Sequence, residues 1–284
     1  MTMNYKRAAH YVLPPVVFEL TRPFRFARAV RAYHRNHSHS YGYSVYRQQV
    51  FKRAIANHSL LNSLQTEQPL PQGYGKDVDE RCIEFPWILA NLGYDHEFVL
   101  DAGSTLNHEY IVSWPGLANK TLHILTLAPE TECYWERGIS YLYADLRNIP
   151  LRDHYYDTIV CASVLEHIGF DNRAYVKEQI YREDRPDDFT QAMKEMRRIL
   201  KSSGRLLLTV PYGKYERQDW FQQFDQHLLE RALEAFGPVS SIRKEFFRQL
   251  PEGWVRSNET SCADASYGVT TRGAGAVACI VAEI

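Results

Sequence analysis

The residues best suited to chemistry are Glu166 and His167, which follow a β-branched apolar run and precede Ile168 and Gly169. An imidazole with an ordinary pKa near ~6.5 accepts a proton from a hydroxyl group at neutral pH, and an adjacent carboxylate can orient the ring. His167 is therefore a candidate general base, with Glu166 as its orienting partner. A histidine that only hydrogen-bonds its own loop is the alternative interpretation.

A second candidate site is the stretch 98–109, in which a short apolar run stops at Asp101 and passes through Gly103 before apolar residues resume. This order predicts a strand, a tight turn and a helix. In an open α/β sheet such a turn presents backbone N–H groups and a helix N-terminus, which favour an anionic ligand group. We expect the ligand to lie there.

A third set, Tyr212, Lys214 and Arg217, follows an apolar run at residues 205–210, and Trp220 and Phe221 come shortly after it. Aromatic rings beside cations suit a sugar ring that bears phosphate, through stacking and charge pairing. We expect these three residues to contact the acceptor molecule. A solvated loop is the alternative interpretation of the same residues.

Seven apolar runs predict the strands that would position these residues. They are residues 98–101, 122–127, 139–143, 156–161, 205–210, 239–247 and 275–283. Helical spacing predicts helices at 45–57, 82–92, 187–201 and 224–236, and Asp77 and Glu80 have capping-box spacing ahead of the second of these. Residues 248–272 are interpreted as a loop. The pattern predicts an α/β fold with a Rossmann-like, mostly parallel seven-stranded sheet and helices on both faces.

The N-terminal part of the chain is basic. Residues 1–60 contain ten Lys and Arg residues against one acid, Glu19, although the whole chain has a net charge of −1. Arginines and apolar residues separate onto two sides of a helix predicted to start near Thr21 and Pro23. This helix either packs its apolar side on the main domain or attracts anionic lipid or a phosphorylated substrate, so we expect a peripheral membrane contact as one option.

The five cysteines are widely spread, and none are paired at metal-ligand or redox-motif spacing. This usage fits a reducing cytoplasm and predicts no metal site. The start of the chain lacks the pattern of an export signal, and no apolar run approaches the ~20 residues that span a bilayer. The acidic remainder of the chain, with no basic stripe, disfavours a nucleic-acid partner. The oligomeric state is left open.

Five motifs in order resemble the class I S-adenosylmethionine-dependent methyltransferases, particularly those of bacterial surface-polysaccharide pathways. The motifs are Val99-Leu100-Asp101-Ala102-Gly103, Tyr143-Ala144-Asp145-Leu146, Tyr156-Asp157-Thr158-Ile159-Val160, Ser163-Val164-Leu165-Glu166-His167-Ile168 and residues 193–211. The resemblance covers roughly residues 80–284. It implies two parts, a basic, mainly helical extension at 1–76 and a cofactor-binding domain at 77–284.

The resemblance also implies site residues for S-adenosyl-L-methionine. The first loop would hold the methionine end of the cofactor through Asp101, Ala102, Gly103, Ser104, Thr105 and Asn107. Asp145 would accept a hydrogen bond from the adenine amino group, with Leu146 beside the ring. Ser163 and Val164 would face the cofactor from the fourth strand.

The sequence departs from the family pattern at two places. Thr105 and Asn107 replace the second and third loop glycines, and Thr tolerates positive φ poorly, so the turn should differ in detail. The acid that usually ends the second strand and holds the ribose hydroxyls is absent, which leaves Thr126 or Glu130 to substitute for it.

The expected activity is O-methylation of a small or glycan-like acceptor, with His167 as the base. A cofactor-binding pseudoenzyme that serves as a scaffold recruited by its basic helix is the alternative from another class. A nucleic-acid methyltransferase is a further alternative.

Overall fold

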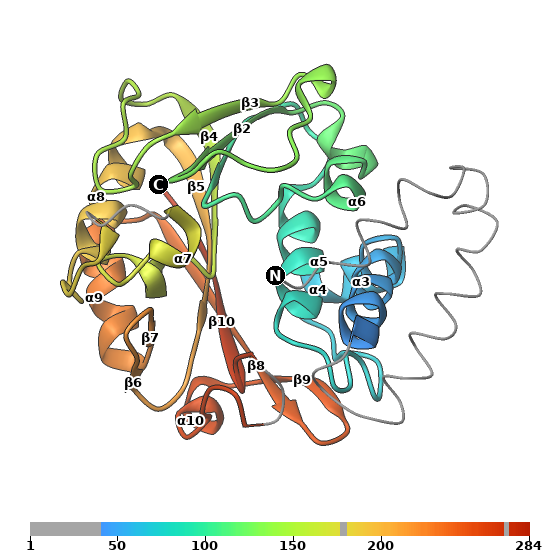
Figure 1. Cartoon of the computed structure of the whole chain (residues 1–284). Coiled ribbons are helices and arrows are strands. Elements are labelled where there is room, and N and C mark those ends of the chain that lie inside the picture. Colours follow the sequence, from blue (N-terminus) through green and yellow to red (C-terminus); the bar gives the residue numbers. More distant parts are fainter. Residues whose placement is uncertain (1–40, 177–180, 270–272) are drawn as a thin grey trace, which may run out of the picture. The chain divides into compact units, whose positions relative to one another are not determined.

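The computed structural model describes residues 41–176, 181–269 and 273–284 (Figure 1). The chain divides into two compact units, residues 1–50 and 51–284. The described part of the first unit, residues 41–50, begins helix α3 (Tyr41–Ile55), where a short helix was predicted at 45–57. The predicted basic helix near residues 21–35 lies outside the described residues, and the boundary predicted at residues 76/77 stays a prediction.

The second unit is built on an eight-stranded sheet in the order β3-β2-β1-β4-β5-β10-β8-β9. The strands are β1 (Phe98–Ala102), β2 (Thr121–Thr126), β3 (Ser140–Tyr143), β4 (Tyr156–Ala162), β5 (Leu200–Pro211), β8 (Ser241–Leu250), β9 (Gly253–Ser257) and β10 (Ala276–Glu283). The first five are parallel, whereas β10 is antiparallel to both β5 and β8. The prediction of a mostly parallel α/β sheet is confirmed. Strands β6 (Glu216–Arg217) and β7 (Gln222–Gln223) form a separate two-stranded sheet.

The order of the strands places the predicted ligand turn at the middle of the sheet. Strand β1 lies between β2 and β4, and Asp101 is in register with Ile124 on one side and Val160 on the other. The chain moves outward from β1 to β2 and β3, then returns to the other side of β1 at β4. In open α/β sheets, the crevice at such a reversal is where ligands bind.

Helices lie on both sides of this sheet (Figure 1). Helices α4 (His58–Gln65) and α5 (Arg81–Leu92) pack together on one side, and α8 (Phe189–Ile199) and α9 (Gln226–Phe236) lie on the other. The apolar side chains of α8 and α9 belong to one buried cluster with residues of the strands. The short helices are α6 (Glu109–Val112), α7 (Arg173–Val176), α10 (Glu259–Cys262), η1 (Pro115–Leu117), η2 (Trp135–Arg137) and η3 (Leu165–His167).

Strand β9 is an addition to the seven predicted strands, because residues 248–272 were interpreted as a loop. Its formation depends on contacts with residues distant in sequence. Trp254 is buried and its Nε1 donates to the backbone oxygen of Val78 at 2.8 Å. Gly253 has φ +137°, and a Cβ there would lie 2.5 Å from the backbone oxygen of Tyr74. Local periodicity carries no signal of these contacts.

The predicted capping box at the start of α5 is wrong. The helix begins at Arg81, so Glu80 itself is the N-cap residue, and it makes no side-chain cap hydrogen bond. Asp77 lies in a turn with φ +58° rather than at the N-cap. The end of the helix was predicted correctly, because Gly93 follows Leu92 with φ +64°.

Among the described residues, no helix has the length and apolar character needed to cross a membrane.

Candidate functional site

A cavity of about 390 Å³ opens at the carboxyl ends of β1, β2, β3 and β4. This volume falls in the range of pockets that bind small molecules. The predicted site residues that line it are Gly103, Ser104, Thr105, Thr126, Asp145, Leu146, Ser163, Val164 and His167. Four strand ends that are far apart in sequence thus contribute to one cavity.

The loop after β1 is folded around the carboxylate of Asp101. This side chain is fully buried and accepts hydrogen bonds from the backbone N–H groups of Thr105 (3.1 Å) and Leu106 (2.7 Å). Burial raises the pKa of Asp101 to about 7, although these two hydrogen bonds act to lower it. Asp101 does not line the cavity; its role in this structure is to hold the turn that does.

Backbone conformation in this loop follows from how closely it approaches β4. Gly103 has φ +116°, and a Cβ there would lie 2.2 Å from Val164 Cγ2, so only glycine fits. The next positive φ is at Ser104 (+63°), not at Thr105 or Asn107. The left-handed residue of this turn is therefore Ser104, whereas the sequence pattern singles out Thr105 and Asn107.

Ser104 lines the cavity and also carries an unsatisfied polar atom. Its Oγ is buried and has no hydrogen-bond partner among the described residues. A buried hydroxyl without a partner is costly, and such groups in native structures usually meet a ligand or water.

At the opposite end of the cavity, Asp145 and Leu146 follow β3, and Arg147 comes next. The backbone N–H of Arg147 donates to Asp145 Oδ1 at 2.8 Å, and its Nη2 donates to Asp145 Oδ2 at 2.5 Å. Burial acts to raise the pKa of Asp145, but the hydrogen bonds and charge of Arg147 outweigh it, so the pKa is lowered. Asp145 is thus an ionised acceptor, which suits an amino group. Thr126 and Glu130 both line the cavity nearby.

The carboxyl ends of β4 and β5 are held by a buried carboxylate of α5. Glu84 is fully buried and accepts hydrogen bonds from Ser163 Oγ and Thr209 Oγ1, both at 2.6 Å. It also pairs with Arg81, whose Nη1 lies 2.8 Å from Glu84 Oε2 and donates to the backbone oxygen of Ala162. Arg81 lines the cavity, and its guanidinium is paired there with Glu84.

His167 lines the same cavity in a defined tautomer. Its Nδ1 lies 3.0 Å from the backbone oxygen of Trp220, and its ring stacks on the Trp220 indole with centroids 5.2 Å apart. A carbonyl oxygen only accepts, so Nδ1 carries the proton and Nε2 keeps its lone pair. Burial lowers the pKa of His167 to about 4, which keeps the ring neutral near pH 7.

Glu166 is not hydrogen-bonded to His167 in this structure. Its Oε1 lies 3.8 Å from His167 Nε2, beyond hydrogen-bond length, and its Oε2 is buried with no partner among the described residues. Burial raises the pKa of Glu166 well above its usual value. The backbone of Trp220, not the predicted carboxylate, therefore orients the imidazole here.

Several predicted site residues lie away from the cavity. Ala102 is buried in β1, and Asn107 is held by the backbone oxygen of Glu132 and the hydroxyl of Tyr141. Tyr212 is buried with its hydroxyl 3.2 Å from Glu259. Lys214 is exposed.

Arg217 pairs with Asp184 at a separate cavity. The structure therefore does not bring the three predicted acceptor residues to His167. Trp220 and Phe221 of the same loop do lie against its ring.

Other cavity residues were not predicted from the sequence, namely Arg81, Phe85, Arg147, Gly169, Asn172, Tyr175, Tyr181 and Glu183. Arg147 follows Asp145 by two residues, and this spacing is the only local signal that could have identified it. Asn172, Tyr181 and Glu183 belong to a polar insertion after η3, whose path the sequence pattern does not predict.

Comparison with known proteins gives one family match. Residues 124–208 match the family described as a methyltransferase domain. No curated protein matches the chain in sequence.

One solved structure similar to the chain is 1,6-didemethyltoxoflavin-N1-methyltransferase of Burkholderia thailandensis, with bound 1,6-didemethyltoxoflavin and S-adenosylhomocysteine. The two sequences are 12% identical, the alignment covers 96% of this chain and 91% of that chain, and the TM-score is 0.43. A SAM-dependent methyltransferase of Archaeoglobus fulgidus is also similar in structure. The two sequences are 13% identical, the alignment covers 68% of this chain and 89% of that chain, and the TM-score is 0.45.

The matched segment runs from within β2 to within β5 and includes Asp145, Ser163 and His167. The cavity between these elements fits a cofactor with an amino group at Asp145 and polar groups at Ser104 and Arg81. Residues 124–208 are therefore similar to a methyltransferase domain, and this match supports S-adenosylmethionine as the cofactor.

Proposed function

We propose that this chain transfers the methyl group of S-adenosylmethionine to a hydroxyl oxygen of a small or glycan-like acceptor, with His167 as the general base. The observation that carries the proposal is the tautomer of His167. Its Nδ1–H donates a hydrogen bond to the Trp220 carbonyl oxygen, so the lone pair lies on Nε2. The ring of His167 lines the cavity.

The residues of the cavity divide between the parts of the cofactor. Asp145 and Leu146 would hold the adenine ring, and Thr126 or Glu130 would bind the ribose hydroxyls. Ser104 Oγ and Arg81 would meet the methionine end, where the cofactor carries a carboxylate. When bound, the cofactor supplies a methyl group activated by a sulfonium, so the protein has mainly to orient the acceptor and manage its proton.

His167 would take the hydroxyl proton at Nε2 as the acceptor oxygen attacks. A pKa of about 4 makes the ring a weak base, yet it ensures that the base is unprotonated at neutral pH.

Two features of the chain bear on the nature of the acceptor. Aromatic rings near the cavity, including Phe85 and Tyr175, suit stacking on a sugar or another flat ring. The basic segment 1–60 would attract an acceptor that carries phosphate or an anionic membrane surface. We propose a cytoplasmic enzyme with a peripheral membrane contact on this basis.

The first test is calorimetric titration of S-adenosylmethionine and S-adenosylhomocysteine into the purified chain and its Asp145→Ala variant. The proposal expects binding that Asp145→Ala weakens strongly. No binding at millimolar cofactor by a folded chain would contradict it. A screen of hydroxylated acceptors, starting with nucleotide sugars, would follow.

Binding without turnover on any acceptor would favour the scaffold alternative, and RNA binding with a steep salt dependence would favour a nucleic-acid methyltransferase.

A further inference from the structure

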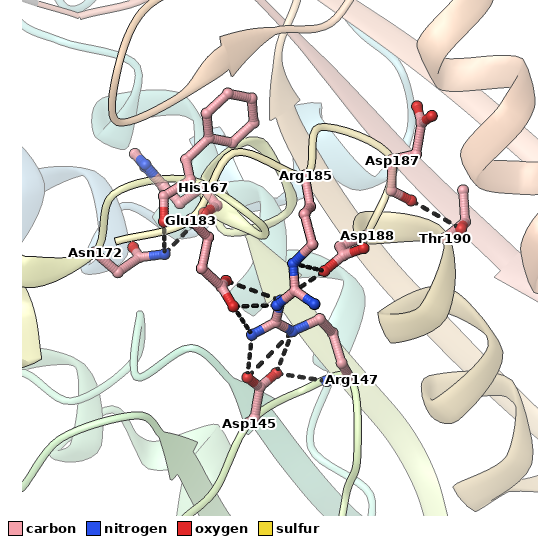
Figure 2. Close-up of polar contacts among 10 residues, drawn as sticks. Asp145, Arg147, His167, Asn172, Glu183, Arg185, Asp187, Asp188 and Thr190 are labelled. Carbon is pink, nitrogen blue, oxygen red and sulfur yellow. Dashed lines mark hydrogen bonds and ion pairs between the residues drawn. The ribbon is translucent and has the colours of Figure 1, made fainter. Parts of the chain in front are cut away.

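Arg147 connects Asp145 to two carboxylates of the insertion that follows η3 (Figure 2). Its Nη1 lies 2.6 Å from Asp188 Oδ2 and 2.8 Å from Glu183 Oε2, while its Nε and Nη2 bond to Asp145. The Arg147 side chain is only 13% exposed. One guanidinium thus holds three acids that come from two separate loops.

The two insertion acids belong to residues 181–188, which we call the cavity wall because Tyr181 and Glu183 line the cavity. This wall is bonded back to the chain just after His167. The backbone N–H of Arg185 donates to the Gly169 oxygen at 2.8 Å, and that of Asn172 donates to the Tyr181 oxygen at 2.9 Å.

The side chain of Asn172 donates in turn to the backbone oxygen of His167 at 2.9 Å. The wall therefore joins the adenine end of the cavity to the residue proposed as the base.

A second arginine provides a natural comparison. Arg185 bonds the same Glu183 and pairs with Asp188, its Nε lying 3.2 Å from Asp188 Oδ2. It is 57% exposed, and within the described ranges no hydrogen bond links it to Asp145. Arg185 balances the charges of Glu183 and Asp188 but makes no hydrogen bond to Asp145 in the part of the chain that the structure describes. Arg147 balances the same two charges and also bonds Asp145.

We propose that Arg147 is a positioning residue that orients Asp145 toward the adenine amino group and fastens the cavity wall over that end of the cofactor. This inference rests on the proposed function, since it assigns Asp145 to adenine. Without Arg147, three carboxylates would face one another with only the exposed Arg185 to balance them, so Asp145 and the wall would separate.

The first experiment measures the binding of S-adenosylhomocysteine and of its 6-oxo analogue, in which a carbonyl replaces the adenine amino group. The wild-type chain should prefer the amino compound, because an ionised Asp145 only accepts hydrogen bonds. Arg147→Ala should weaken binding of S-adenosylhomocysteine roughly tenfold or more and reduce this preference, since the carboxylate is no longer oriented.

The matched control is Arg185→Ala, which should leave the preference unchanged and the affinity within about threefold. Arg147→Lys keeps a charge but loses the planar fork, so it should recover only part of the affinity. Equal effects of Arg147→Ala and Arg185→Ala on the preference, in folded variants, would overturn the inference and leave the proposed function intact. Failure of the wild-type chain to bind S-adenosylhomocysteine would instead contradict the proposed function.

A double-mutant cycle tests the link in another way, because Asp145 and Glu183 both bond to Arg147. Asp145→Asn and Glu183→Gln should have non-additive effects on S-adenosylhomocysteine affinity when Arg147 is present. The same two substitutions should become additive in the Arg147→Lys background, where one ammonium cannot hold both acids in the same geometry. Additive effects in the wild-type background would overturn the proposed coupling.

Discussion

The imidazole Nδ1 of His167 lies 3.0 Å from the backbone oxygen of Trp220, and this contact sets which nitrogen of the ring is basic. The two residues are separated by the cavity wall and the β5 strand in sequence. His167 lines the cavity together with Gly103, Ser104 and Thr105 of the β1 loop.

Replacing His167 with Gln should remove the base without removing the ring's neighbours. We expect methyl transfer to fall by about 10²- to 10⁴-fold, while the affinity for S-adenosylhomocysteine changes little. His227, an exposed histidine on α9, provides the control, and His227→Gln should leave both quantities unchanged. A His167→Gln variant of normal activity would show that His167 is only a structural residue of its loop.

The pH dependence of activity should reflect the depressed pKa of His167. Protonation blocks the base, so the rate under limiting substrate should stay level from pH 8 down to about pH 5 and then fall, with an apparent pKa of about 4. An unperturbed histidine would give the same fall near pH ~6.5. A rate profile measured with a stable acceptor distinguishes the two, and a midpoint near 6.5 would mean that the ring is exposed when it reacts.

Asp101 should make stability depend on pH in a characteristic direction. Its pKa of about 7 in the folded chain exceeds the usual 3.8, so the folded state binds more protons between these values. The contribution of this group to the free energy of unfolding therefore declines as pH rises from about 4 to 7.

Asp101→Asn removes this titration and should flatten the slope of stability in that window, measured by urea unfolding at several pH values. It should also cost about 1–3 kcal/mol at pH 4, because an amide cannot accept from both the Thr105 and Leu106 N–H groups as the carboxyl does. An unchanged slope would indicate that Asp101 titrates normally.

Ser104→Ala should separate binding from stability. The Ser104 Oγ is buried without a partner among the described residues, so its removal should leave the melting temperature unchanged or slightly higher. If this hydroxyl bonds the cofactor, the dissociation constant for S-adenosylhomocysteine should rise roughly five- to tenfold. Thr190→Ala, at an exposed hydroxyl on α8, is the control for both measurements. A lower melting temperature with unchanged affinity would assign Ser104 to the fold alone.

The sequence by itself determined the elements of the core and the turn at its centre. Continuous apolar runs predicted β1 to β5 and the last two long strands, because strands buried on both faces need no polar alternation. The change from strand to turn at Asp101 and Gly103 located the cavity, since the carboxyl ends of parallel strands meet at one edge. The position of Asp145 at the end of β3 followed from the same reasoning.

Only the tertiary structure decided how the site is held together. The Trp220 carbonyl on His167, the contact of Arg147 with Glu183 and Asp188, and Arg81 beside the β1 loop all join residues from separate elements. The strand β9 depends in the same way on Tyr74 and Val78. Periodicity reports which face of an element is buried, but hydrogen bonds between loops depend on the path of each loop, which no local pattern encodes.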